Sequence, residues 1–391
     1  MHERLGIPAR PKEAGRTLDR KLTRDEAGKE IILDGFLKHE TAHDRGPEKK
    51  VYHVLAHPKV VEQRAMRLAD VMQLSEDQKL IARMAIAFHD VVIKVTYPPP
   101  YDPAQPKTML GMAQRMRGAR EGDQPAGVLG NEALSANLLV QKMQEANAAA
   151  AATLFSEDDM QIVRLAIEYT YPAAEVGGPP DFDGIPFTSH AEYYREVIQA
   201  NPDIQELLEN LHSSGITKGP LFRQPHLEAM LDRGERVPPE ALIVAIADLG
   251  AAGMGTSEDF FNEGDREFLE IHPNLADLRV QARLRSAEGA PERALVAGDM
   301  LKWLDGQAGF SAWQAIRVGK IRMQMQSFGD IYSMRNENLH NAVGRFKENA
   351  SSAAIRAGER TRAYHDRAAT DERIAFIQLA DAMGYTIEKN E

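Results

Sequence analysis

A histidine and an aspartate stand side by side at the end of an apolar segment. The stretch MAIAFHDVV, residues 84–92, is apolar up to Phe88 and then places His89 next to Asp90. Two ionisable groups at the end of a buried segment are costly unless something compensates them. A divalent cation would do so, because imidazole and carboxylate groups are both good ligands for such ions. The doublet therefore predicts a metal site.

The segments on either side of the doublet have helical patterns. A helix is expected from His57 onward, with Pro58 at a first-turn position that proline favours. Residues 75–78 form a capping box for the helix that runs into the doublet, and Ser156 caps another helix. Residues 238–255 begin with prolines and end in glycines, as a helix does. These segments could bring distant polar residues to one place.

The remaining pattern is also helical. Separate helices are expected over 257–271, 291–306 and 311–332, followed by a charged pair of helices after residue 336. No convincing run of alternating strands and no repeat of fixed period is visible. The expected fold class is therefore all-α.

Three segments carry a further pattern in chain order. YHVLAHPKVV supplies a His, AIAFHDVV supplies His-Asp, and IVAIADLG supplies an Asp. This order resembles that of the HD-domain metal-dependent phosphohydrolases. The resemblance implies a helical bundle that binds a divalent metal ion through His57, His89, Asp90 and Asp248. Two neutral imidazoles and two carboxylates balance a doubly charged ion, but do not choose among Mn, Fe, Co, Ni, Zn and Mg.

A second match lies further along the chain. GNEALSANLL, residues 130–139, resembles the NE…SA segment of one branch, the predicted metal-dependent HD-superfamily phosphohydrolases. LAIEYTYP resembles the next helix of that branch, which ends in a Thr, here Thr170. The resemblance covers about residues 50 to 285. It departs from the branch in a long insertion, and in Tyr171 and Pro172 where members often place a His.

The resemblance implies roles for these residues. Glu132 is expected to position or deprotonate the attacking water, together with Asn131 and the ligand Asp90, and Thr170 is expected to contact substrate. Each reading has an alternative. Glu132 is also an ordinary first-turn glutamate favoured by the helix dipole. Asn131 could simply cap the helix, which is the preferred single reason for it.

The insertion, residues 93–130, is too long for an ordinary connection and is expected to be a functional loop or lid. Its basic side chains could bind phosphate. For any one of them a solvated surface position is the better reading, although we expect at least one to contact substrate. The candidates are Lys94, Lys107, Arg115, Arg117 and Arg120.

Other histidines bear on the number of metal ions. His53 precedes His57 by four residues, but Pro58 indicates that the helix starts after His53. A packing or surface role is therefore preferred for His53. The alternative is that it supports a metal ligand or contacts substrate. A dinuclear site would need further histidines between Asp90 and Asp248. Only His190, His212 and His226 are available there, so one ion per chain is expected.

Composition limits the remaining classes. The 391 residues contain no cysteine, which excludes disulfides, thiolate zinc sites and a Cys nucleophile. The net charge of −11 argues against a nucleic-acid partner. The N-terminus lacks the apolar region of a signal peptide, and no stretch resembles a membrane span, so a cytoplasmic protein without a membrane partner is expected.

The expected organisation has three parts: an N-terminal arm (1–48), an HD-type metal-binding helical domain (49–290), and a C-terminal helical extension (291–391). The charged C-terminal helices are read as solvated faces, with a subunit contact in a homo-oligomer as the second choice. The expected function is metal-dependent hydrolysis of a phosphoester in a nucleotide or other small phosphorylated metabolite, with a metal-activated water as nucleophile. The alternatives are a di-iron oxygenase on the same scaffold, or a non-catalytic binding module stabilised by metal.

Overall fold

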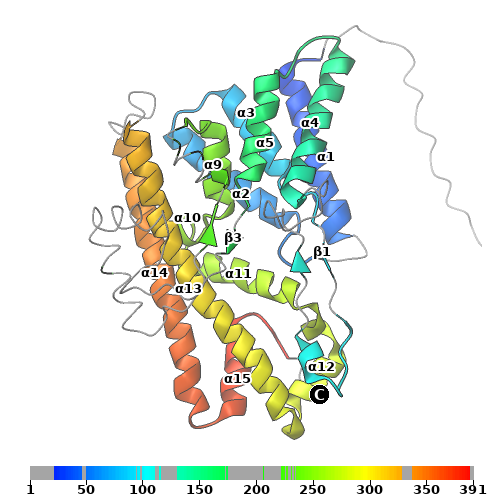
Figure 1. Ribbon diagram of the computed structural model, residues 1–391, viewed down its shortest axis with the longest axis vertical. Coiled ribbons are helices and arrows are strands. Elements are labelled where there is room, and N and C mark those ends of the chain that lie inside the picture. The colour runs from blue at the N-terminus through cyan, green and yellow to red at the C-terminus, as the bar shows by residue number, and fades with distance from the viewer. Residues whose placement is uncertain are drawn as a thin grey trace, which may run out of the picture.

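In the part of the chain that the structure describes, nearly all regular structure is helical (Figure 1). The computed structural model describes residues 22–45, 50–93, 95–96, 99–110, 114–115, 130–171, 173–174, 222–224, 235–327 and 337–387, and single positions 206, 226, 227, 230 and 233. These residues form twelve α-helices. Their only strands are two-residue pairs: β1 (Val95–Thr96) with β2 (Gln114–Arg115), and β3 (Ala173–Ala174) with β4 (Phe222–Arg223). The expected all-α fold is confirmed.

The larger of two hydrophobic cores lies among the helices at the top of Figure 1. Its helices are α1 (Arg24–His39), α2 (Ala56–Val71), α3 (Glu76–Phe88), α4 (Asn131–Ala150), α5 (Glu157–Glu168) and α9 (Pro239–Asp248). The capping boxes expected at Ser75 and Ser156 are both present. Every residue from Glu240 to Asp248 is buried, which suits a helix that is apolar all round.

The N-terminal segment contributes a helix to this core. Ile31, Ile32 and Phe36 of α1 are buried against α3. The two helices approach closely at Gly35, where an added Cβ would lie 2.5 Å from the carbonyl oxygen of Ala87. A five-residue π-helix, η1 (Glu40–Asp44), continues α1. Residues 24–44, which fall in the expected arm, thus lie beside the helix that ends at the His-Asp doublet.

A second core lies at the lower end of Figure 1. The C-terminal elements are α10 (Ala251–Met254), α11 (Ser257–Ile271), η3 (Pro273–Ala276), α12 (Leu278–Arg285), η4 (Ala287–Gly289), α13 (Ala290–Ser327), α14 (Glu337–Ala368) and α15 (Glu372–Ala382). The long helices α13 and α14 lie side by side and antiparallel, and they connect the two cores (Figure 1).

The prediction of separate helices over 291–306 and 311–332 was wrong, because α13 runs without a break through the first segment and on through residues 311–327. Residues 328–332 lie outside the described residues. Gly306 lies inside it, with nothing within 4 Å of an added Cβ. A glycine in a helix interior costs only about 1 kcal/mol relative to alanine. The packing of α13 along α14 outweighs that penalty.

Part of the insertion packs on the second core. Tyr101 and Met109 are buried there, and Met109 ends a 3-10 turn, η2 (Pro106–Met109). The Asn274 side chain donates hydrogen bonds to the carbonyl oxygens of Pro99 (3.0 Å) and Thr108 (2.7 Å). Residues 99–110 of the insertion are therefore anchored to η3 and its neighbours.

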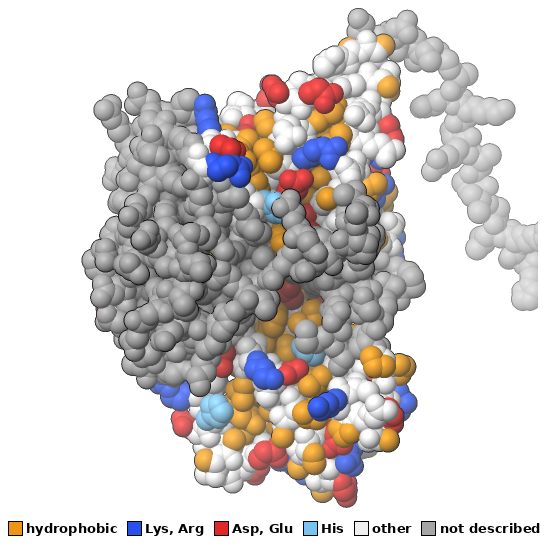
Figure 2. Space-filling view, viewed as in Figure 1, with side chains coloured by type: hydrophobic (Ala, Val, Ile, Leu, Met, Phe, Trp, Pro, Cys, Tyr) orange, Lys and Arg blue, Asp and Glu red, His pale blue; other side chains and the backbone are white. Residues whose placement is uncertain are grey.

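The surface mixes charges of both signs. In Figure 2, Lys and Arg side chains and Asp and Glu side chains lie scattered among hydrophobic ones over the described part of the visible face. Among the described residues, no helix combines the length and the apolar character needed to cross a membrane.

Candidate metal centre

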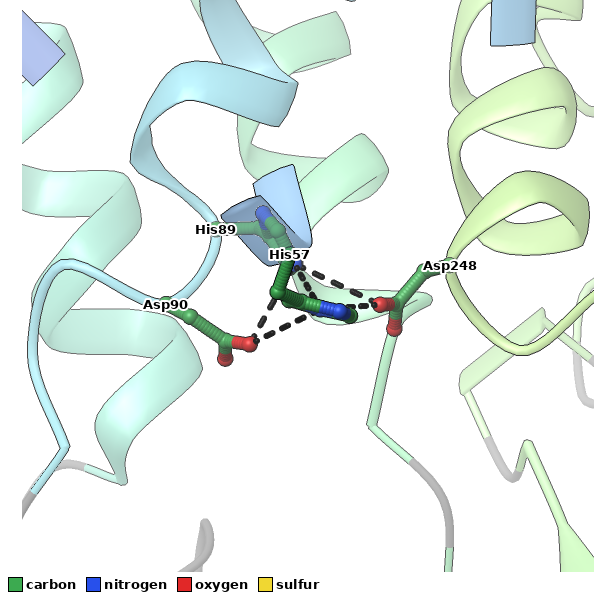
Figure 3. A group of neighbouring side chains, drawn as sticks. All are labelled: His57, His89, Asp90 and Asp248. Carbon is green, nitrogen blue, oxygen red and sulfur yellow. Dashed lines mark hydrogen bonds and ion pairs between the residues drawn. The ribbon is translucent and has the colours of Figure 1, made fainter. Parts of the chain in front are cut away.

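Four side chains from separate parts of the chain converge on one point (Figure 3). His57 lies in the first turn of α2, His89 and Asp90 follow α3, and Asp248 is the last residue of α9. The His57 Nε2 atom lies 3.2 Å from both His89 Nε2 and Asp248 Oδ1. Asp90 Oδ2 lies 3.5 Å from His57 Nε2 and 3.3 Å from His89 Nε2.

This arrangement fits a metal ion. One ligand atom from each residue lies within 4.8 Å of all the others, the only such group among the described residues. The nitrogen–oxygen separations of 3.2 to 3.5 Å within the group match the roughly 3 to 3.6 Å expected between ligands about 2.1 Å from a shared ion. The group is buried, so its charges need a partner. The residues that the sequence selected as ligands could therefore hold one divalent ion.

The charges of the group are strongly coupled. Burial lowers the pKa of His57, but hydrogen bonds with Asp248 and Asp90 outweigh burial and raise this pKa to about 9. Burial also lowers the pKa of His89, but the carboxylates of Asp90 and Asp248 outweigh burial and raise this pKa well above its usual value. Burial would raise the pKa values of Asp90 and Asp248, but nearby histidines hold both well below their usual range. His89 and His57 act on both carboxylates, and His53 also acts on Asp90. Protons on the imidazoles thus balance the carboxylates in the metal-free protein.

Backbone contacts orient the doublet. His89 Nδ1 lies 2.8 Å from the carbonyl oxygen of Ile86, which requires that Nδ1 carry the hydrogen. Its Nε2 atom then faces the other ligands with its lone pair available whenever the ring is neutral. The carbonyl oxygen of Asp90 accepts a hydrogen bond of 3.0 Å from His43 Nε2. Both residues of the doublet are therefore fixed through backbone carbonyls.

The structure excludes a surface position for His53, whereas a buried packing role remains compatible with it. The His53 side chain is buried, and its Nε2 lies 3.4 Å from Asp90 Oδ2. Its Nδ1 lies 2.9 Å from Oε1 of Glu270, near the end of α11. His53 therefore bridges a candidate ligand and a helix that sequence reasoning did not connect with the site.

The same helix makes a second contact nearby. Arg64 of α2 donates two hydrogen bonds to the carboxylate of Glu263, one of them 3.1 Å long. The Arg64 side chain is buried. Close to the same part of α2, the ring of Tyr52 lies 4.5 Å from the ring of His57. Burial raises the pKa of Tyr52 well above its usual value, so this hydroxyl stays protonated. Helix α11 thus also contacts the middle of α2, through Glu263 and Arg64.

Two further histidines were missed by sequence reasoning. His39 and His43 lie where α1 becomes the π-helix, and both are buried. The ring of His39 lies 6.3 Å from that of His89. Burial, reinforced by His89, holds the pKa of His39 well below its usual value, so its ring is neutral. Neither histidine stands at a spacing typical of metal ligands. Only the helical pattern that continues through α1 could have pointed to them.

Helix α4 begins next to the doublet. Ser135 is buried, and its hydroxyl accepts a hydrogen bond of 3.1 Å from the backbone N–H of Val92. The helix starts at Asn131 with Gly130 as its N-cap, and no side chain caps it. The capping role preferred for Asn131 was therefore wrong. Asn131 is buried and Glu132 is half-buried in the first turn.

The predicted substrate contacts are more scattered. Thr170 is buried after α5, and its hydroxyl donates to the carbonyl oxygen of Ile167. Lys107 is exposed in η2. Arg115 has a described backbone in β2, but its side chain and all of Lys94, Arg117 and Arg120 lie outside the described residues.

Of the three histidines considered for a second ion, the structure describes only His226. His190 and His212 lie outside the described residues, whereas His226 is exposed, with its ring 6.2 Å from that of Tyr171.

The fold and the site define an all-α protein with a buried His/Asp group that could hold a metal ion. The chain matches no protein-family model, no curated protein and no solved structure. Its site is therefore interpreted from its own residues.

Proposed function

We propose that this chain is a divalent-metal-dependent phosphohydrolase of the HD type. It would cleave a phosphoester in a nucleotide or another small phosphorylated metabolite. The observation that supports the proposal is the convergence of His57, His89, Asp90 and Asp248, which occur in the chain in the H…HD…D order of that family.

The four residues would hold the ion. A bound divalent ion polarises a phosphoryl oxygen and lowers the pKa of water. The chain's contribution is to fix the donors: Ile86 sets the tautomer of His89, and His43 fixes the backbone at Asp90. Four protein ligands leave positions for water and substrate in a six-coordinate shell.

Glu132 is the proposed group that orients or deprotonates the attacking water through its carboxylate. The bond between Ser135 and Val92 ties the first turns of α4 to the segment that directly follows Asp90. Glu132 lies in that first turn. Asn131, buried at the start of the same helix, would hold the water or a substrate oxygen through its amide.

Basic residues of the insertion are the proposed phosphate contacts. The β1–β2 pairing sets the backbone of Arg115 opposite Val95, close in sequence to Asp90. Lys94 precedes Val95 directly. An arginine suits phosphate because its planar group can donate two parallel hydrogen bonds.

The test measures metal content per chain and phosphate release from a panel of nucleotides in the same preparations. Wild type should contain about one ion, and Asp90→Ala should lose both the metal and the activity because it removes a ligand. Glu132→Gln should keep the metal and lose turnover. The control is Asp77→Ala, since Asp77 is an exposed carboxylate in the first turn of α3.

Other results would select the alternatives. Two irons per chain without phosphate release would favour the oxygenase. One ion with no release from any nucleotide or small phosphoester would favour the non-catalytic module. A wild-type protein that takes up no added metal would reject the metal centre itself.

A further inference from the structure

The carboxylate of Glu270 organises the turn that precedes α2. Its Oε2 atom accepts hydrogen bonds from the backbone N–H groups of Val51 (3.1 Å), Tyr52 (2.8 Å) and His53 (3.0 Å). Three donors on one oxygen favour the ionised carboxylate, which can only accept. This contact joins residues far apart in the sequence, and the side chains of both His53 and Glu270 are about 5% exposed.

The other oxygen of Glu270 determines the state of the His53 ring. Because Oε1 only accepts, His53 Nδ1 must carry a hydrogen and donate it across 2.9 Å. The ring then turns Nε2 toward Asp90 Oδ2, 3.4 Å away. The His53 ring therefore lies between two carboxylates: it is held by Glu270 and faces Asp90.

Asp90 is the candidate ligand that most needs such support. It lies just past the end of α3, whereas Asp248 still belongs to a helix. Its side chain is 20% exposed, against 9% or less for the side chains of the other three candidate ligands. A carboxylate on a turn can adopt several orientations, and only some of them face His57 and His89.

We propose that His53 and Glu270 are positioning residues of the metal centre: Glu270 fixes the ring of His53, and this ring, with Nε2 3.4 Å from Asp90 Oδ2, holds the Asp90 carboxylate in its metal-binding orientation. This inference rests on the proposed metal binding. It extends the centre into α11, so that the end of that helix influences metal affinity without contacting the ion. Partners of this kind are typically worth about 10–100-fold in metal affinity.

Two substitutions at His53 separate its two contacts. His53→Asn places an amide where Nδ1 lies, so it can still donate to Glu270 but cannot reach Asp90. His53→Gln extends an amide toward the position of Nε2 and can still contact Asp90. We expect His53→Asn to weaken Co²⁺ affinity about 10–100-fold and to change the visible spectrum of bound Co²⁺. His53→Gln should recover part of the affinity.

The measurement is a titration of chelator-treated, full-length protein with Co²⁺, with helical content and thermal midpoint recorded for each metal-free variant. The matched control is His272→Asn. His272 is another buried histidine beside a carboxylate, with Nε2 3.5 Å from Asp299 Oδ2, and it directly follows α11. Its loss should lower the thermal midpoint and leave Co²⁺ affinity unchanged.

Glu270→Gln tests the same contact from α11. Its amide oxygen can still accept the backbone hydrogen bonds, but the charge that fixes His53 is gone, so affinity should fall by a smaller factor. This variant decides the question if His53→Asn does not fold.

Wild-type affinity and spectrum in His53→Asn would overturn the inference while leaving the proposed function intact. Equal weakening in His53→Asn, His53→Gln and His272→Asn would also overturn it, because the effect would then be general destabilisation. A wild-type protein that binds no Co²⁺ or other divalent ion would reject the proposed function, and this inference with it.

Discussion

His57 Nε2 and Asp248 Oδ1 lie 3.2 Å apart and join the start of α2 to the end of α9. The two helices pack along the first core, so their ends bring a proton donor and a carboxylate together in a buried place. These two side chains either share a proton or both bind the same metal ion. The pair therefore affects the properties of both the metal-free and the metal-loaded protein.

Asp248→Asn should remove this relationship while keeping the size of the side chain. Metal affinity should fall by at least the roughly 10–100-fold typical of a supporting residue, because here a ligand is lost. The pKa of His57 should also fall from about 9, since the hydrogen bond with Asp248 is the main effect that raises it. Equilibrium dialysis and a histidine NMR titration measure the two effects. Unchanged metal binding would exclude Asp248 from the site.

The stability of the metal-free protein should depend on pH. The folded-state pKa of His57 is about 9, above the ordinary value of about 6.5. A group whose pKa is raised by folding stabilises the protein fully below its unfolded pKa and loses that stabilisation as pH rises through the folded pKa. Urea unfolding in the presence of chelator should therefore show stability falling between pH 6.5 and about 9.

Metal should reverse this trend, because binding requires deprotonated imidazoles. The difference in unfolding midpoint between metal-loaded and chelated protein should increase over the same pH range. His57→Asn is the control, and its chelated form should show a flatter pH dependence. A wild-type curve that rises with pH in chelator would contradict the assignment of the proton to this site.

The sequence predicted the candidate ligands because their signals are local. The His-Asp doublet follows an apolar helix with a capping box, and Pro58 marks the first turn of the helix that carries His57. These features depend on a few neighbouring residues, so they can be read without the fold. The all-α class follows from the same local periodicity.

The supporting contacts could not be predicted in this way. Glu270 reaches His53 only because α11 packs near the start of α2, and nothing in the acidic segment around Glu270 distinguishes it from a solvated face. His39 reaches the site because α1 folds onto α3. The continuity of α13 was missed for a related reason: the local penalty of its glycines is visible in the sequence, but its packing on α14 is not.

The ion pair between Arg64 and Glu263 should contribute to stability as a unit. The side chain of Arg64 is 6% exposed and that of Glu263 is 19% exposed, so removing one partner leaves a largely buried charge. Arg64→Met should lower the free energy of unfolding by about 3 kcal/mol. The double variant with Glu263→Gln should be less destabilised than the sum of the single variants. Urea unfolding of all four proteins measures the coupling, and additive effects would contradict it.

The close approach of α1 and α3 should make Gly35 sensitive to a single methyl group. An alanine Cβ there would lie 2.5 Å from the carbonyl oxygen of Ala87 and 2.8 Å from the ring of Phe88, the residue directly before His89. Gly35→Ala should cost about 1–3 kcal/mol of unfolding free energy through overpacking and should also weaken metal binding by shifting His89.

Gly298→Ala is the matched control, because Gly298 is inside α13 with nothing within 4 Å of an added Cβ. That change should stabilise the protein by about 0.5–1 kcal/mol, since alanine loses less backbone entropy in a helix. Thermal unfolding and Co²⁺ titration of both variants test the pair. If Gly35→Ala stabilised the protein as Gly298→Ala is expected to, α1 would not be packed against the end of α3. His39 and His43 would then not lie beside the His-Asp doublet.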